Sequence, residues 1–559
     1  MSRTRARLVN QRLRLLLLLI VLTFAGLLAR TAYLQTVRAS ALAAAATAQT
    51  LISVPVPAVR GTIFDRTGTP LAIAQPATDV IADPMQITNP ARTARIVAEV
   101  LGVRRAPLMR ALSDSKSQYY VVERQARPAD ARALQRLNLP GFTFQTDERR
   151  GYPQRTVAAP VLGFMGVDKP LGGLELQLNN VLAGRAGKAT VMRDATGQTV
   201  DTQQTQPVQN GKNVYLTIDS HIQANAEQIL QQTVAQYGAK DATAIVLDPR
   251  TGAILAMAQE PGYDANSFPQ VYGQGLTVEH AVTNVFEPGS VFKVVTIGGA
   301  LSQHDITPNT VFTVPGSLNV ADRVIHDAEP HGTEQLHVWQ ILQRSSNIGT
   351  DEIAAKYLGE SGLKHWMTRF GLKAKTGIDF PGESAGILPS YWSGSTIGTV
   401  PIGQGVSVTA IQLAAVYSAI ANNGVWVQPH LVDHVVGQQQ QRPRRHRVLS
   451  PSVDRQLRAM LKGVVSDQGT AVLAAIPGYS VAGKTGTAQK PGPNGYLTGK
   501  YVATFVGMVP SAAPRLVVLV SVDEPQGQIF GGLVAAPAFE QIASFDLEYL
   551  GVPPDLPLH

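Results

Sequence analysis

The sequence predicts an α/β (α+β) protein in three parts: one N-terminal transmembrane helix, a mixed α+β domain, and a larger domain with a central antiparallel sheet flanked by helices. An uncharged apolar run covers Leu15–Ala29 and, extended to Leu34, is long enough to span a membrane. Short strand and helix patterns rich in Gly and Pro alternate from Arg60 to about Thr205. Apolar runs separated by turn residues follow, and 559 residues exceed the length of one typical domain.

The N-terminal helix is expected to stay in place as a plasma-membrane anchor. The span at 15–34 follows a basic tail, residues 1–14, and the positive-inside rule places this tail in the cytoplasm and the rest of the chain outside. The alternative is a signal peptide cleaved after Ala41. That position lies far beyond the apolar run, with Arg30 and Arg38 in between. The tail carries five arginines, at positions 3, 5, 7, 12 and 14.

The net charge of +8 is concentrated in two short segments. The tail holds five arginines, and the segment 438–447 holds four more, Arg442, Arg444, Arg445 and Arg447. Neither segment contains an acidic residue, so the rest of the chain sums to about −1. This distribution argues against nucleic-acid binding. The segment 438–447 is predicted to be a mobile surface loop, with contact to an anionic cell-wall polymer or lipid as the alternative.

The mixed domain is expected at 35–205 and the C-terminal domain at 213–550, separated by a polar linker at 203–211. Pro249–Gly252 is a turn signal between two apolar runs, which indicates a hairpin. The other predicted strands follow one another closely near the C-terminus, so an antiparallel order is natural. Strands of the C-terminal domain are predicted at 244–248, 253–257, 479–488, 502–506 and 516–520.

A serine and a lysine three residues apart, Ser290 and Lys293, open an apolar helical run. Residues at i and i+3 face the same way on a helix, so the hydroxyl and the amine are expected to touch. A neutral amine can take the proton of a hydroxyl and make it a nucleophile. Pro288-Gly289 predicts a sharp turn that exposes the serine. The same spacing at Ser113 and Lys116 lies in a polar stretch and is rejected.

Two further motifs follow in chain order. The first is Ser345-Ser346-Asn347, within a helical pattern that runs from Val338 to Ile348. The second is Lys484-Thr485-Gly486-Thr487, on a strand of small residues that can lie close to a substrate backbone. Ser317–Asn319 and Lys375–Gly377 match the two motifs but lie in turn-rich segments and are rejected.

The three motifs together resemble those of the penicillin-recognising serine acyl-enzymes. The whole chain resembles a class B penicillin-binding protein, a monofunctional peptidoglycan D,D-transpeptidase. The segment Asn284–Ser290 is most similar to the cell-division, FtsI-like branch rather than the elongation branch. The other segments that carry the resemblance are Arg60–Gly68, Tyr152-Pro153, Leu162–Phe164, Gly173–Glu175, Gly184–Gly187 with Arg193-Asp194, Leu216–Asp219 and Gly252–Met257.

The resemblance implies a substrate, a stem peptide ending in D-Ala-D-Ala, and a role for each motif residue. Ser290 is the nucleophile, Lys293 the base and Ser345 a proton relay. Asn347 would hold the substrate's peptide carbonyl, and Lys484 its terminal carboxylate. Thr485 and Thr487 would help to bind this carboxylate, and Ser346 and Gly486 would complete the substrate-binding group. The backbone N–H groups of Ser290 and Thr487 would form the oxyanion hole.

The resemblance also implies partners: β-lactams, a membrane glycan polymerase and divisome proteins. No cofactor is expected. No metal site is expected either, since His326, His331 and His337 lack metal-ligand spacing. Glu175 and Arg193 are expected in internal salt bridges or domain contacts. The alternatives are an elongation-type transpeptidase, a D,D-carboxypeptidase, a penicillin sensor, and a β-lactamase, for which no water-activating glutamate is evident.

Overall fold

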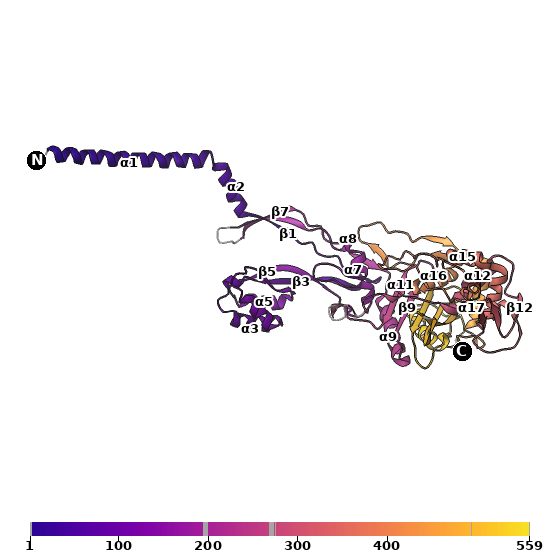
Figure 1. Cartoon of the computed structure of the whole chain (residues 1–559). Coiled ribbons are helices and arrows are strands. Elements are labelled where there is room, and N and C mark those ends of the chain that lie inside the picture. The colour runs from indigo at the N-terminus through magenta and orange to yellow at the C-terminus, as the bar shows by residue number, and fades with distance from the viewer. Residues whose placement is uncertain (1–2, 194–198, 268–272, 274, 494, 558–559) are drawn as a thin grey trace. The chain divides into compact units, whose positions relative to one another are not determined.

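The computed structural model describes residues 3–193, 199–267, 273, 275–493 and 495–557. The chain divides into two units. The first comprises residues 1–59 and 184–210, and the second comprises 60–183 and 211–559. Figure 1 labels some of their helices and strands.

The first unit contains a long apolar helix and a small sheet. Helix α1 (Arg3–Thr36) is followed by α2 (Ala39–Thr50). The apolar part of α1, Val9–Thr36, is 28 residues long, and none of it is buried. At 1.5 Å per residue it measures about 42 Å, which exceeds the hydrocarbon thickness of a bilayer. Within the described residues, α1 is the one helix long and apolar enough to cross a membrane (Figure 1).

The sheet of the first unit corrects the predicted linker. Its antiparallel strands are β1 (Leu51–Val56), β6 (Gly187–Arg193) and β7 (Thr199–Gln206), in the order β1-β6-β7. Gln203 and Gln204 pair with Thr190 and Ala189 of β6. The first four residues of the expected linker at 203–211 therefore form a strand, because a polar glutamine run can still supply backbone hydrogen bonds to a neighbouring strand.

The N-terminal part of the second unit is built on a sheet of six strands, ordered β18-β8-β2-β3-β4 with β5 also paired to β3. Because β8 and β18 come from the C-terminal region, the two predicted domains share this sheet. Its strands are β2 (Ile63–Phe64), β3 (Pro70–Ala82), β4 (Tyr120–Ala126), β5 (Phe142–Gly151), β8 (Val214–Leu216) and β18 (Val432–Val435). The helices are α3 (Pro90–Leu101), α4 (Arg105–Leu112), α5 (Pro128–Arg136), α6 (Ala159–Leu162), α7 (Gly173–Gln177) and α8 (Asn179–Leu182).

The predicted central antiparallel sheet is present in the C-terminal part of this unit. Its order is β10-β9-β22-β21-β20, and every neighbouring pair is antiparallel. The predicted hairpin across Pro249–Gly252 joins β9 to β10. The strands are β9 (Asp241–Leu247), β10 (Ile254–Glu260), β20 (Ala482–Gly492), β21 (Gly495–Val509) and β22 (Leu516–Asp523).

Both faces of this sheet are covered by helices. Along β22, Val517 and Leu519 belong to one buried cluster, while Val518 and Val520 belong to another. This alternation with period two is expected when a strand is buried on both sides. One face packs on α9 (Ser220–Tyr237) and α18 (Gly531–Tyr549). The other packs on a helical layer formed by α12 (Lys293–Ser302), α13 (Val338–Gln343), α14 (Asn347–Ile353), α15 (Gly359–Arg369), α16 (Ala410–Ala421) and α17 (Pro451–Val464).

Short elements connect these layers. They are α11 (His280–Thr283), β11 (Val285–Phe286), β12 (Val311–Val314), β13 (Leu318–Val320), β14 (Arg323–Ile325), β15 (Glu334–His337), β16 (Val408–Thr409), β17 (Val425–Val427) and β19 (Arg445–Arg447).

The arginine-rich end of segment 438–447 is ordered, which corrects the prediction of a mobile loop. Strand β19 pairs with β17. The Arg444 guanidinium donates to Gln428 Oε1 at 3.0 Å and to the Thr376 carbonyl oxygen at 3.0 Å. Arg447 donates to the Asn423 carbonyl oxygen at 2.9 Å. The five donors of a guanidinium can satisfy loop carbonyls, so a basic run need not be a solvated segment.

Candidate active site

The Ser290 hydroxyl lies on a tight turn at the start of α12. Residues Gly289–Phe292 form a 3₁₀ turn that runs directly into the helix. Gly289 has φ +55°, a left-handed conformation that glycine adopts without strain, and its N–H donates to the Gly403 carbonyl oxygen at 3.0 Å. The predicted sharp turn is therefore present. Ser290 is half-buried, and its hydroxyl makes no hydrogen bond with any described residue.

The Lys293 amine is fully buried and points to the second motif. It donates to the Ser345 carbonyl oxygen at 2.5 Å and to Asn347 Oδ1 at 2.7 Å, and it lies 3.3 Å from Ser345 Oγ. The expected hydrogen bond between Lys293 and Ser290 is not formed among the described residues. The Lys293 side chain is long enough for its amine to reach Ser345 and Asn347. Their oxygen atoms replace the hydrogen bonds to water that the amine loses on burial.

Ser345 does not lie within one continuous helix as predicted. Helix α13 ends at Gln343, α14 begins at Asn347, and Ser345 between them has φ +62°. A side chain in this region is strained, and such strain often occurs at functional sites. The neighbouring Ser346 is buried, and its hydroxyl accepts from the Gly349 N–H at 3.0 Å as the N-cap of α14. This capping role fixes the Ser346 side chain at the start of α14.

The third motif lies on β20, which is an edge strand of the central sheet. Lys484 is fully buried and its amine donates to Ser345 Oγ at 2.9 Å. Thr485 and Thr470 share a hydrogen bond between their hydroxyls at 2.7 Å, and Thr487 Oγ1 accepts from the Gly531 N–H at 3.1 Å. The three predicted motifs therefore converge, with Ser345 Oγ between the two lysine amines.

Gly486 allows β20 to approach the Ser290 turn closely. A Cβ at this position would lie 2.8 Å from the Pro288 carbonyl oxygen and 3.1 Å from Val291 Cγ1. Any side chain here would push the strand away from the turn. The absence of a side chain at Gly486 therefore permits the close packing of β20 against the Ser290 turn.

Burial changes the protonation of both lysines. Burial lowers the pKa of Lys293 to about 7, although the carboxyls of Asp327 and Asp351 oppose this shift. Burial, followed by the nearby charge of Lys293, lowers the pKa of Lys484 well below its usual range. Two ammonium groups that share one hydroxyl oxygen without water repel each other. At pH 7 about half of the Lys293 amines are therefore neutral, which is the form that a general base requires.

Two aspartates that support the site were not predicted. Asp327 Oδ1 accepts from the N–H groups of Asn347 at 2.5 Å and Ile348 at 3.0 Å. Asp351, four residues after Asn347 on α14, is buried, and neither of its carboxyl oxygens has a partner among the described residues. Burial raises the pKa of Asp351 to about 8. Asp327 directly follows His326 in the chain, and no motif or spacing in the sequence marks either aspartate as part of the site.

His331 and His326 hold Asp327 and Asn347 in place. His331 Nε2 lies 3.1 Å from Asp327 Oδ2, and the His326 carbonyl oxygen accepts from Asn347 Nδ2 at 2.8 Å. In the described ranges, no group of three His, Cys, Asp or Glu side chains is arranged to hold a metal ion.

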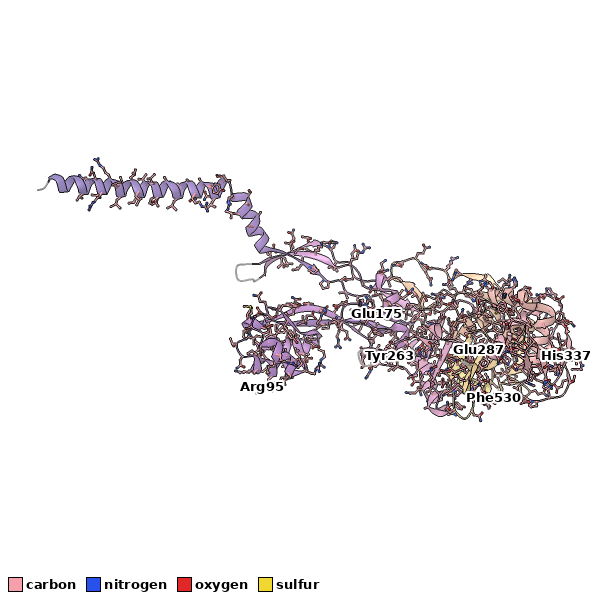
Figure 2. All side chains as sticks on the ribbon, in the orientation of Figure 1. Arg95, Glu175, Tyr263, Glu287, His337 and Phe530 are labelled. Carbon is pink, nitrogen blue, oxygen red and sulfur yellow. The ribbon has the colours of Figure 1, made fainter. Side chains whose placement is uncertain are left out.

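Two further acidic residues have structural roles, Glu287 next to the Ser290 turn and Glu175 in the N-terminal part of the second unit (Figure 2). Glu287 Oε1 accepts from the Gly405 N–H at 2.9 Å and Oε2 from the Tyr496 hydroxyl at 2.9 Å, which anchors the segment before Ser290. Glu175 is fully buried and pairs with Arg60 and Arg150 at 2.6 Å each. This confirms the predicted internal salt bridge for Glu175, whereas the Arg193 side chain lies outside the described residues.

A serine on a turn, two buried lysines and a serine between them, beside the edge of a five-stranded sheet, define a serine acyl-transfer enzyme. Residues 242–544 match the family described as "Penicillin binding protein transpeptidase domain". Residues 55–170 and 171–216 match the "Penicillin-binding Protein dimerisation domain". The chain belongs to the class B penicillin-binding proteins, which confirms the predicted family, fold class and transpeptidase chemistry.

Proteins of known sequence or structure resemble it over nearly its whole length. It is 33% identical to the probable peptidoglycan D,D-transpeptidase PenA of Neisseria meningitidis and 32% identical to the peptidoglycan D,D-transpeptidase FtsI of Escherichia coli. Each match covers 98% of this chain and 94% of the relative. The crystal structure of penicillin-binding protein 3 of Mycobacterium tuberculosis with aztreonam has a TM-score of 0.71 at 31% identity, covering 90% of this chain and 99% of that one.

Proposed function

We propose that this penicillin-binding protein cross-links peptidoglycan stem peptides ending in D-Ala-D-Ala through an acyl-enzyme on Ser290, in septal cell-wall synthesis. One observation carries the chemistry: Ser345 Oγ lies 2.9 Å from the Lys484 amine and 3.3 Å from the Lys293 amine, beside the turn that holds Ser290. The septal role rests on the Asn284–Ser290 segment and on the full-length similarity to FtsI.

Acylation begins when the Ser290 oxygen attacks the carbonyl carbon of the penultimate D-alanine. Neutral Lys293 takes the hydroxyl proton as the C–O bond forms. The N–H groups of Ser290 and Thr487 stabilise the oxyanion, worth about 3 kcal/mol per donor. Ser345 then passes a proton to the departing amine as the C–N bond breaks. Ser345 is suited to this relay because its oxygen faces both lysine amines, whose protons can replace the one it gives.

Substrate recognition uses the edge of the sheet and the second motif. Lys484, Thr485 and Thr487 bind the terminal carboxylate, and this negative charge favours the protonated form of Lys484 when substrate is bound. Asn347 Nδ2 gives one hydrogen to the His326 carbonyl oxygen. Its second hydrogen is left to hold the substrate's peptide carbonyl.

The acyl-enzyme is resolved by an amine from a neighbouring stem peptide, which forms the cross-link and frees Ser290. A β-lactam acylates Ser290 in the same way, but its leaving amine stays attached to the acyl group and the site remains blocked. Penicillin-binding protein 3 of M. tuberculosis has been crystallised with aztreonam and with ampicillin, which supports β-lactam binding by the present chain.

We place the protein in the plasma membrane as a single-pass protein. The proposed parts are a cytoplasmic tail at 1–14, a span at 15–34, a pedestal at 35–205 and an extracytoplasmic transpeptidase domain at 213–550. The exposed apolar helix and the five arginines before it support this arrangement. A membrane glycan polymerase and divisome proteins are the proposed partners, reached through the anchor and the pedestal.

Depletion in cells tests the septal role. Loss of the protein should block septation and give filaments, with stem-peptide cross-linking reduced at division sites. Growth as spheres or wide cells would assign the protein to elongation instead. Purified protein supplied with donor stem peptide and an acceptor amine should form the cross-linked product. Release of D-alanine without a cross-link would favour the carboxypeptidase reading.

A further inference from the structure

A polar cavity lies away from the motif residues of the transpeptidase site, at the turn between β9 and β10. Its volume is about 420 Å³, within the range of small-ligand pockets. None of the motif residues lines it. Its walls come from segments far apart in the chain: the turn after β2, the β9–β10 turn, the segment 430–445 and the residues before β22.

The lining is strongly basic. Five arginines line the cavity, against two carboxyl groups, Asp248 and Asp433. The arginines are Arg66, Arg250, Arg442, Arg445 and Arg515. Their sum is +3 with His430 neutral, in a chain whose residues outside the N-terminal tail and segment 438–447 sum to about −1. All five arginines are exposed to solvent, and an anion placed among them would be attracted by several guanidiniums at once.

Both carboxyl groups of the cavity are already engaged. Asp248 accepts from the Arg250 side chain, with Oδ1 and Oδ2 each at 3.2 Å from its donors. Asp433 Oδ2 contacts His434 Nδ1 at 2.7 Å, and Oδ1 accepts from Gln440 Nε2 at 3.3 Å. Arg445 also has a structural contact, since it donates to the Arg250 carbonyl oxygen at 3.2 Å.

The remaining three arginines have no such contacts. In the part of the chain that the structure describes, the guanidiniums of Arg66, Arg442 and Arg515 form neither a hydrogen bond nor an ion pair. Arg444 and Arg447, from the same basic segment as Arg442, each bind loop carbonyls. The segment therefore divides into arginines that stabilise the fold and one that faces the cavity unpaired.

We propose that this arginine pocket binds a phosphate-bearing anion, from either a lipid headgroup or a soluble phosphate compound. Guanidinium forks match the oxygen geometry of phosphate and bind it through two parallel hydrogen bonds. A carboxylate brings one negative charge, whereas a phosphate monoester brings about 1.5 to 2 and a diphosphate more. The excess of +3 is thus matched better by phosphate, and the cavity is large enough for a phosphate with a small substituent.

The test compares two triple variants of the full chain in neutral detergent. R66Q/R442Q/R515Q removes the three unpaired arginines. R92Q/R95Q/R132Q removes three exposed arginines on α3 and α5, and so makes the same change in net charge elsewhere (Arg95 is labelled in Figure 2). Calorimetric titration with inorganic pyrophosphate, at matched ionic strength in chloride, should show one saturable site in wild type and in the second variant. The first variant should bind at least about tenfold more weakly.

A second arm distinguishes the sources of phosphate. Mixed micelles containing phosphatidic acid, whose headgroup is a phosphate monoester, are compared with micelles of neutral phosphatidylcholine, and phenylglyoxal labelling followed by mass spectrometry reads the reactivity of Arg66, Arg442 and Arg515. Protection by pyrophosphate assigns a soluble phosphate, and protection by phosphatidic acid alone assigns a headgroup. Equal binding by the two triple variants, or no protection by either probe in wild type, would overturn the proposal. Penicillin labelling of each variant confirms that it has folded.

Discussion

Replacing Lys293 with arginine should remove the general base while keeping a positive charge. The fully buried Lys293 amine has a pKa of about 7, so about half of the molecules carry a neutral amine at pH 7. A lysine at its ordinary pKa near 10.4 would be neutral in about 0.04% of molecules at that pH. Burial thus raises the population of the base by about 1,000-fold. An arginine stays protonated throughout the useful range, so Lys293→Arg should lower acylation by about 10²- to 10⁴-fold.

The assay is the second-order rate of acylation by one β-lactam from about pH 6 to 10. Wild type should gain rate as the pH rises through about 7 and then level off, because the neutral amine is the active form. This rise of the acylation rate with pH, the basic limb of the pH–rate profile, should be absent in Lys293→Arg. Lys484→Arg is the contrast and should lose less, since its proposed role in the complex is to carry charge. Rates near wild type in Lys293→Arg would refute the argument and make Ser345 or Lys484 the next candidate base.

Four other predictions test Asp351 beside the site, the buried salt bridges of Glu175 and the membrane anchor. Asp351→Asn removes a carboxyl that raises the pKa of Lys293, so the same pH–rate limb should move to lower pH, and an upward shift would contradict this. The Asp351 pKa of about 8 lies above its ordinary 3.8, so its contribution to the unfolding free energy is present at low pH and is lost as pH rises from about 4 to about 8. Urea unfolding should therefore show Asp351→Asn gaining stability relative to wild type between pH 5 and 8. Glu175→Gln leaves Arg60 and Arg150 without their buried partner and should cost about 3 to 5 kcal/mol of unfolding free energy, whereas exposed Glu99→Gln should cost little. The full-length protein should remain in membranes after carbonate washing, and a soluble product starting near Thr47 would show cleavage instead.

The arrangement of the site could be predicted from the sequence where motif and element type agreed. Pro288-Gly289 predicted the turn at Ser290, and the small residues around Lys484 predicted a strand. Turn residues and apolar runs predicted the hairpin across Pro249–Gly252, and with it most of the central sheet. These signals come from residues close together in the chain. In each of these segments, the structure that the residues favour locally is the one found in the folded protein.

The remainder depends on contacts between distant residues. A helical pattern over Val338–Ile348 hides the left-handed residue at Ser345, because apolar spacing is preserved across the break. The link from Asp327 to Asn347 spans twenty positions and leaves no periodic signal. The Lys293 amine pairs with Ser345 and Asn347 rather than Ser290 for the same reason: spacing shows which side chains share a helix face, but not what lies opposite that face.

The most direct test of the account is the site at which a labelled penicillin becomes attached. Intact-mass analysis of the purified protein should show one covalent adduct, and peptide mapping should place it on Ser290. The Ser290→Ala variant should give no adduct, while Ser113→Ala, at the exposed serine that shares the same spacing to a lysine, should be labelled as wild type is. An adduct that persists in Ser290→Ala, or one that maps to Ser113, would contradict the assignment of the nucleophile.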